Sequence, residues 1–139
     1  MQWKGTLPPG KVYGRPVSTL DIVPTALAAA GIVPPADAKL DGVNLIPFLK
    51  GNATGDPHER LVWRYLRRDL WAIREGDWKL RHDKGKREQP KLYDLSNDLA
   101  EANDLAAQFP ERVKSLQAAY EAWAKDLPMP LWNNDKSVE

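Results

Sequence analysis

The sequence predicts an α+β protein in which a small antiparallel sheet of four strands is packed by one long C-terminal helix. In the middle of the chain, short runs of aromatic and β-branched residues are separated by turn residues, a pattern that favours strands. After Pro110, apolar residues recur every three to four positions, as they do along one face of a helix. Because such a helix must cover apolar surface, and one face of the sheet offers it, the two patterns together predict two packed layers.

The composition is typical of a folded domain. Hydrophobic residues make up 42% of the 139 residues and charged residues 28%, close to globular averages. A chain of this length can bury roughly two thirds of its unfolded surface, so a core needs no disulfide or metal. No apolar run approaches the roughly 20 residues that span a bilayer, and we expect no membrane partner. The absence of cysteine excludes disulfides, thiolate metal sites and a cysteine nucleophile within this chain.

The first third of the chain predicts two helices. A serine at position 18, followed by Asp21 and an apolar stretch with Pro24 in its first turns, predicts a helix over residues 18–30. Gly31 is the expected stop. Residues 40–43 are typical of a turn, residues 45–49 predict a short apolar helix, and residues 52–59 resemble a linker.

The middle third predicts the sheet. Glu75, Gly76 and Asp77 separate two strand-like runs in the manner of a tight hairpin, with glycine supplying a positive φ. A charged loop over residues 82–90 precedes the last strand. The four predicted strands are residues 61–66, 71–74, 78–81 and 91–94.

The last third predicts the long helix. Pro110 suits its first position, and the tail from residue 128 is expected to be irregular. The apolar stripe consists of Val113, Leu116, Tyr120, Trp123 and Leu127.

Few residues are arranged for chemistry. His58 and His82 are the only histidines, neither has the spacing of a metal-ligand set, and we expect both to be exposed loop residues. The chain contains no nucleophile elbow, phosphate loop or dinucleotide fingerprint. Residues 94–98 are expected to close the last strand through side-chain hydrogen bonds, with Asn103 or Asp104 capping the next segment. We therefore predict no catalytic and no metal-binding residue here.

Positive charge gathers in the middle third. Residues 60–91, the basic aromatic block, carry eleven basic and five acidic side chains, a net charge of +6. Aromatic faces beside guanidinium groups can hold a polyanion such as a sulfated glycan or nucleic acid. The competing interpretation, favoured by strand alternation, places most aromatics in the core and the charges on a solvated face. The members of the block are Arg60, Trp63, Arg64, Tyr65, Arg67, Arg68, Trp71, Arg74, Trp78, Lys79, Arg81, Lys84, Lys86 and Arg87.

Four motifs in order resemble the C-terminal end of a sulfatase. The family closes with a serine-threonine-leucine-aspartate helix, an aspartate-glycine turn, an arginine-x-glycine-aspartate-tryptophan-lysine hairpin and a leucine-tyrosine-aspartate-leucine strand. Residues 3–10 also resemble the family's tryptophan-x-glycine-lysine-x-proline-x-glycine loop. Leu99 departs from the pattern, because the family usually has proline there. The matching segments are residues 17–25, 40–51, 72–80 and 92–95.

The resemblance implies a sulfuric-ester hydrolase of the alkaline-phosphatase superfamily. Such enzymes use a formylglycine, made from cysteine or serine in a C/S-x-P-x-R motif, beside a calcium ion held by aspartates and asparagine. None of the four serines stands in that motif. The resemblance therefore implies that the nucleophile and the metal ligands lie upstream, and that this segment alone is inactive. A phosphodiesterase or phosphoglycerate-mutase-like relative fits the first third but fits the hairpin less well.

The resemblance also implies a division of the chain. Residues 1–55 would be the end of the large α/β domain, a strand-loop-helix remnant, and residues 56–139 the C-terminal subdomain. The expected partners are a sulfate-ester substrate and the upstream domain, without nucleic acid or membrane, in a parent that is periplasmic or secreted. The apolar helix over residues 18–30 would expose a patch when alone and favour self-association. The residues implied as substrate contacts are His58, Arg64, Tyr65 and Arg67.

Overall fold

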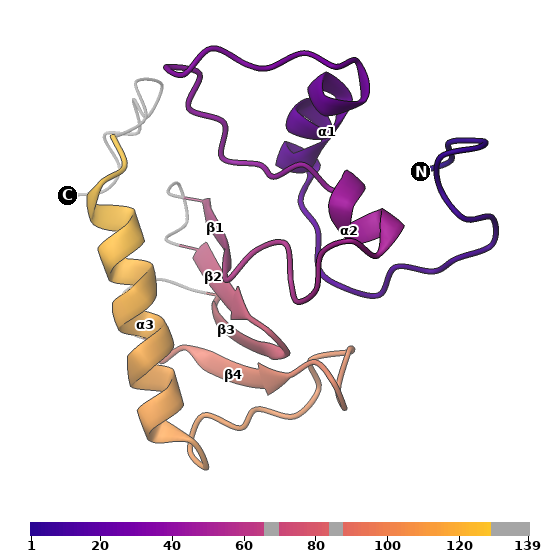
Figure 1. Ribbon diagram of the computed structural model, residues 1–139. Helices are drawn as coiled ribbons and strands as arrows, with labels where there is room; N and C mark the ends of the chain where they lie inside the picture. Colours follow the sequence, from indigo (N-terminus) through magenta and orange to yellow (C-terminus); the bar gives the residue numbers. More distant parts are fainter. Residues whose placement is uncertain (66–69, 84–87, 129–139) are drawn as a thin grey trace. The chain divides into compact units, whose positions relative to one another are not determined.

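The computed structural model describes residues 1–65, 70–83 and 88–128 of the chain (Figure 1). These residues form two compact units, Met1–Glu59 and Arg60–Glu139. The predicted division between residues 55 and 56 lies in the loop just before this boundary. Each unit is described by itself below.

The first unit contains a short 3-10 helix and two α-helices. The 3-10 helix η1 covers Thr19–Asp21 and leads directly into α1, Ile22–Ala29, while α2 covers Ile46–Lys50. The expected single helix thus begins as a 3-10 turn, because Pro24 has no N–H to donate to the carbonyl four residues earlier. Ser18 caps this start, since its Oγ accepts a hydrogen bond from the Leu20 N–H at 3.2 Å. Gly51 ends α2 with a φ of 83°.

The second unit is built on an antiparallel sheet. Its strands are β1 (Leu61–Tyr65), β2 (Leu70–Glu75), β3 (Trp78–His82) and β4 (Lys91–Asp94), in the spatial order β1-β2-β3-β4. Glu75 pairs with Trp78 around the hairpin, where Gly76 has a φ of 57°. This topology confirms the four-stranded antiparallel sheet that the sequence predicts.

The long helix α3, Pro110–Lys125, packs along one face of this sheet (Figure 1). The register places Ile73 beside Leu80 and Leu80 beside Leu92, so one row of side chains crosses β2, β3 and β4. Leu116 of α3 joins these three in the core. Burying such aliphatic side chains stabilises a fold by about 1.5–3 kcal/mol each. The predicted α+β layer arrangement is therefore confirmed.

His82 departs from expectation. We predicted an exposed loop histidine, but His82 is the last residue of β3 and only 6% exposed. Its ring stacks on Trp71 at 5.5 Å between centroids, and Trp71 in turn stacks on Tyr120 of α3 at 4.1 Å. Its Nε2–H donates to the Glu88 carbonyl oxygen at 3.0 Å. The extra strand residue thus completes an aromatic stack beneath the helix.

The two faces of β1 differ. Val62 packs against the core under α3, whereas Trp63 and Tyr65, on the opposite face, are 49% and 51% exposed. The expectation that strand alternation buries most of the aromatics holds for Trp71 and Trp78 and is wrong for these two. Strand alternation was correct as a rule, but the buried face of an edge strand cannot be identified from five residues.

The segment after β4 is organised by side-chain hydrogen bonds, as predicted. Asp94 Oδ1 accepts from the Ser96 N–H at 3.0 Å, and Asp98 accepts from the Asn103 N–H at 2.8 Å. Asp104 Oδ1 accepts from the N–H of Leu92 at 3.1 Å and so ties the segment back to the sheet. These contacts position the chain for its entry into α3.

Candidate functional site

The most connected polar side chain of the first unit is Asp21, at the end of η1. It lies there because Ser18 begins the turn and donates its N–H to Asp21 Oδ2 at 2.7 Å. Asp21 Oδ1 accepts from the Val43 N–H at 2.9 Å. The His58 Nε2 lies 2.8 Å and 2.9 Å from the two carboxylate oxygens. One carboxylate therefore joins three segments of the chain.

Thr25 of α1 extends this arrangement. Its Oγ1 accepts from the Leu45 N–H at 3.0 Å and donates to the Val43 carbonyl oxygen at 3.4 Å. Gly42 lies so close to η1 that a Cβ there would be 2.0 Å from the Leu20 carbonyl oxygen. We call Asp21, Thr25, Val43 and His58 the polar hub. The hub fixes the aspartate-glycine turn against α1.

Burial and hydrogen bonding act against each other at Asp21. Its side chain has no exposed surface, and this burial by itself raises the pKa of the carboxyl. The hydrogen bonds from His58, Ser18 and Val43 outweigh burial, so the pKa of Asp21 is lowered overall. The carboxylate is thus held in its charged form, which suits a structural anion more than a proton donor.

His58 is not the exposed loop residue that we expected. It lies in the loop before β1, but its side chain is only 11% exposed because it pairs with Asp21. The two partners are 37 positions apart in the sequence, which explains why spacing did not reveal the pair. We predicted that His58 contacts substrate, and in the structure its side chain contacts Asp21.

Of the other predicted substrate contacts, Arg64 and Tyr65 are described, and they lie on opposite faces of β1. Arg64 Nη1 donates to the Ala124 carbonyl oxygen at 3.2 Å, at the C-terminal end of α3, where a cation also complements the helix dipole. Tyr65 is half exposed on the opposite face of β1. Arg67 lies outside the described residues. Within the second unit, the structure therefore does not bring Arg64 and Tyr65 together in one cleft.

The basic aromatic block is largely paired where the structure describes it. Six of its eleven basic side chains lie in the described ranges, and five of these six donate to a protein oxygen. Arg81 donates to Glu101 Oε2 at 2.5 Å and to Asp83 Oδ2 at 2.8 Å, and Lys79 also pairs with Glu101. The remaining pairs are Arg60 with Glu75, Arg64 with Ala124, and Arg74 with Gly76 and Asp77.

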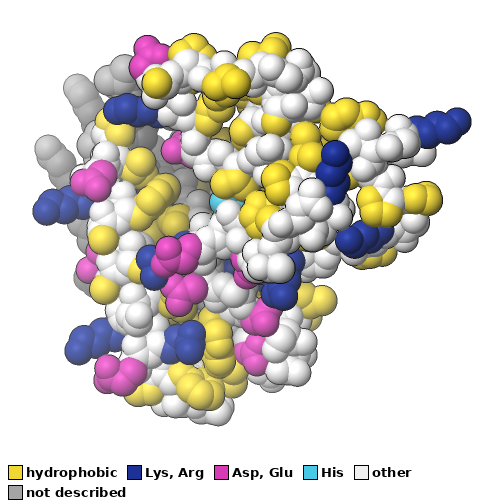
Figure 2. All heavy atoms as spheres, viewed as in Figure 1, with side chains coloured by type: hydrophobic (Ala, Val, Ile, Leu, Met, Phe, Trp, Pro, Cys, Tyr) yellow, Lys and Arg dark blue, Asp and Glu magenta, His cyan; other side chains and the backbone are white. Residues whose placement is uncertain are grey.

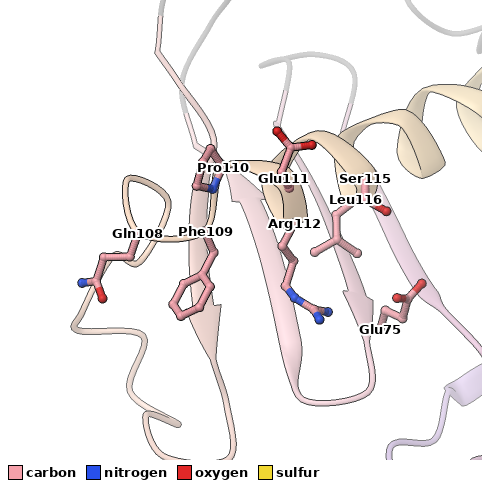
Figure 3. Close-up of a pocket in the computed structure, with 8 residues that line it drawn as sticks. All are labelled: Glu75, Gln108, Phe109, Pro110, Glu111, Arg112, Ser115 and Leu116. Atoms are coloured by element: carbon pink, nitrogen blue, oxygen red, sulfur yellow. The ribbon is translucent and has the colours of Figure 1, made fainter.

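A groove of about 560 Å³ lies where α3 begins, facing the end of β2. Figure 3 shows Arg112 and Leu116 extending from the helix beside Phe109, with Glu75 across from them. Trp78 lies beneath, edge-on to Phe109 at 5.1 Å and under the Arg112 guanidinium at 4.8 Å. The sequence analysis missed this groove, and only the proline that begins the helix hinted at its position. The residues that line the groove include no nucleophile hydrogen-bonded to a base.

The calcium that a sulfatase implies does not fit the residues present. Within residues 1–65, 70–83 and 88–128, no three histidine or acidic side chains gather as a metal site would require. Asp94 and Asp98, two acidic residues that follow the last strand, are occupied by local hydrogen bonds. No helix in the described part of the chain is long and apolar enough to cross a membrane.

A capped helix, an aspartate-glycine turn and a four-stranded meander covered by one helix together define the C-terminal region of a sulfatase. The family model for the C-terminal region of N-sulphoglucosamine sulphohydrolase matches residues 1–125. The chain belongs to this family. Its place in the alkaline-phosphatase superfamily, inferred above from four short motifs, is thereby confirmed.

Two curated relatives are named as sulfatases. The chain is 51% identical over 63 residues to the uncharacterized sulfatase YdeN of Escherichia coli, covering 45% of this chain and 11% of that protein. It is 33% identical over 111 residues to arylsulfatase K of Rattus norvegicus, covering 72% of this chain and 19% of that protein. The chain thus spans less than a fifth of the length of these two relatives.

Solved structures share the fold. Ps i-CgsB, which was also crystallised with k-i-k-neocarrahexaose, has a TM-score of 0.80 and 27% identity, covering 97% of this chain and 30% of that one. A protein solved with its substrate D-glucosamine-2-N,6-O-disulfate has a TM-score of 0.58 and 26% identity, covering 76% of this chain and 23% of that one. The chain corresponds to less than a third of each solved relative.

Proposed function

We propose that this chain is the C-terminal part of an enzyme that hydrolyses sulfate esters, and that the segment alone is inactive. The observation that carries the proposal is the family match over residues 1–125, in a chain whose serines all stand outside a C/S-x-P-x-R motif. In the parent, formylglycine and calcium would supply the nucleophile and the electrophilic metal from upstream residues. The residues of this chain would then shape and support the enzyme.

The individual residues support different roles. Tyr65 has a half-exposed ring on an edge strand, which suits contact with a substrate. His58 pairs with Asp21, so we propose that it positions the loop before β1. Arg64 donates to the Ala124 carbonyl oxygen, so we propose that it positions the end of α3. Arg67 stays a proposed substrate contact on the family resemblance alone.

The division of the chain also enters this proposal. Residues 1–55 would complete the large α/β domain of the parent, and the sheet with α3 would form the subdomain attached to it. The match to Ps i-CgsB supports this division, because it covers 97% of this chain but only 30% of Ps i-CgsB. An upstream domain is therefore the partner that this proposal requires.

The test compares the chain alone with the chain joined to its upstream reading frame. Both are incubated with 4-nitrophenyl sulfate after coexpression with a formylglycine-generating enzyme. We expect turnover only from the joined protein, and none when the cysteine or serine of its C/S-x-P-x-R motif is replaced by alanine. Turnover by the 139-residue chain, or an upstream frame without the motif, would contradict the proposal.

The contact role of Tyr65 is tested in the joined enzyme. Tyr65→Ala should raise KM with little change in kcat, because uniform binding is lost. Trp123→Ala is the matched control, since Trp123 is also a partly exposed aromatic residue but lies on α3. Equal effects of the two substitutions would remove Tyr65 from the proposed contacts.

The alternative function, a module that binds a polyanion through the basic aromatic block, has less support. Five of the six described cations of the block already donate to protein oxygens, and Glu101, Asp83, Glu75 and Asp77 offset much of their charge. Titration with heparin at 50 and 200 mM salt tests it. Saturable binding that weakens steeply with salt would favour this alternative, because released counterions drive such binding.

A further inference from the structure

The groove beside the start of α3 combines an aromatic surface with polar side chains. It is lined by Glu75 at the end of β2 and by side chains between residues 108 and 116, so it lies within the second unit alone. The Phe109 ring is 42% exposed, and the Arg112 guanidinium rests on Trp78 at 4.8 Å from the ring centroid. Figure 3 shows Gln108 on one side of Phe109 and Arg112 on the other. Figure 2 shows basic, acidic and hydrophobic side chains next to one another over this lower end of α3.

Arg112 gives the groove a positive charge. Among the residues that the structure describes, no carboxylate pairs with its exposed guanidinium. Glu75, across the groove, is already held, because Arg60 Nε donates to its Oε2 at 2.5 Å. Stacking on Trp78 fixes the plane of the Arg112 guanidinium and leaves the N–H groups at its edge available. Such a fork binds an oxyanion through two parallel hydrogen bonds.

The other groups of the groove suit a sugar. A pyranose ring has an apolar C–H face, which can pack on the exposed ring of Phe109. Its hydroxyl groups both donate and accept hydrogen bonds, so the Gln108 amide and the Glu111 carboxylate can each bind one. Glu111 lies in the first turn of α3, where the helix dipole offsets its negative charge. A purely apolar ligand would leave Arg112 without an anion, and a bare anion would leave Phe109 exposed to water.

We propose that this groove binds a sulfated sugar unit, with the sugar ring on Phe109 and the sulfate on Arg112. The sugar hydroxyls then lie beside Gln108 and Glu111. No bond is made or broken, because the residues that line the groove include no nucleophile hydrogen-bonded to a base. The inference adds a binding site to the proposed function. It is tested without turnover, so the failure of either one leaves the other intact.

The composition of the lining favours a ligand over a covering domain. Five of the eight lining residues are polar or charged, whereas the buried centre of an interface is depleted of charged residues. Covering Arg112 with protein would remove water from a cation that has no carboxylate partner within the described ranges. A sugar sulfate brings that partner with it. The five polar or charged residues are Glu75, Gln108, Glu111, Arg112 and Ser115.

The test is an NMR titration of the 139-residue chain with N-acetylglucosamine 6-sulfate, a sugar that carries one sulfate group. The backbone N–H signals of residues 108–116 and the indole N–H of Trp78 should shift and saturate, with a Kd on the order of 1 mM. The Ile73 N–H, in the core, is the reference and should not shift. Unsulfated N-acetylglucosamine and inorganic sulfate should each bind roughly tenfold more weakly, since each supplies only part of the contacts. Raising the salt from about 50 to about 200 mM should weaken binding by no more than about fourfold, because a single ionic contact is made.

Paired substitutions assign the contacts. Arg112→Ala and Phe109→Ala should each weaken binding by about fivefold or more, because each removes one part of the site. Lys114→Ala is the matched control for charge, since Lys114 is an exposed cation of α3 outside the groove lining. Trp123→Ala is the matched control for an aromatic ring, since Trp123 is 38% exposed near the other end of α3. The titration of the unsubstituted chain keeps the test valid if a variant does not fold.

A second measurement uses the protein joined to its upstream reading frame. Hydrogen exchange of residues 108–116, followed by mass spectrometry, should be slowed by the sulfated sugar there as well. If the sugar shifts these residues in the chain alone but leaves their exchange unchanged in the joined protein, the upstream domain covers the groove and the proposal is overturned. It is also overturned if inorganic sulfate binds as well as the sugar does, if residues 108–116 do not shift, or if Arg112→Ala and Lys114→Ala have equal effects.

Discussion

Replacing Asp21 by asparagine tests whether the polar hub holds the first unit together. Asparagine keeps the shape but exchanges one carboxylate oxygen for an N–H₂ group. Since Ser18 and Val43 donate to different oxygens of Asp21, one of their N–H groups must then face another donor. Losing a hydrogen bond to a charged group costs about 1.5–3 kcal/mol, and an unsatisfied buried donor costs about 1–3 kcal/mol. We expect a loss of about 3 kcal/mol, or roughly 100-fold in the opening equilibrium.

Hydrogen exchange measured by NMR is the appropriate assay. The Leu45 N–H reports opening of the unit, because it bonds to Thr25 and does not contact Asp21. The Ile73 N–H, in the core of the second unit, serves as the internal reference. Asp37→Asn, a change at an exposed aspartate, is the matched control. If Leu45 exchange in the Asp21→Asn variant stays within about threefold of the unsubstituted chain, the hub is not what stabilises this unit.

Three further predictions follow from the same contacts. The pKa of Asp21 is lower in the folded chain than in the unfolded chain, so the carboxylate stabilises the fold above the unfolded pKa of about 3.9. This stabilisation is lost as the pH falls through the folded pKa. Exchange of the Leu45 N–H, corrected for its intrinsic pH dependence, should therefore become faster as the pH is lowered. Leu116→Ala should destabilise the second unit by about 2–5 kcal/mol, measured by urea unfolding with tryptophan fluorescence, whereas Leu99→Ala should change it by less than about 0.5 kcal/mol. Gly42→Ala should destabilise its unit more than Gly76→Ala destabilises the hairpin, because the first places a Cβ 2.0 Å from a backbone oxygen and the second meets only a strained φ in open space. Exchange of the Leu45 N–H in the first variant should therefore increase more than exchange of the Ile73 N–H in the second.

Local patterns predicted most of the sheet and the helices. The hairpin at Gly76 and the start of α3 at Pro110 follow from the backbone preferences of single residues, and both were confirmed. The bonds of Asp94 and Asp98 were predictable for the same reason, because their partners lie within five residues. Turns, helix starts and local hydrogen bonds depend on neighbouring residues, so the sequence alone predicts them.

The candidate site was less predictable, because it depends on contacts between distant segments. Asp21 and His58 meet only once the chain has folded around the aspartate-glycine turn, so no spacing rule identifies them. Arg64 belongs to the basic aromatic block by sequence, yet its partner is the carbonyl of Ala124, 60 residues later. The assignment to the sulfatases rested on the order of several motifs, and the family match confirmed it.

The way the first unit is held has a calorimetric consequence. Its buried residues are Asp21, Thr25 and Leu45, of which two are polar, whereas the second unit buries a continuous aliphatic core. Exposure of apolar surface raises the heat capacity by about 0.45 cal/mol/K per Å², and exposure of polar surface lowers it. Opening of the first unit should therefore change the heat capacity little. A calorimetric scan of this chain reports mainly the melting of the sheet and α3, while the polar hub opens over a broad range of temperature beneath that signal.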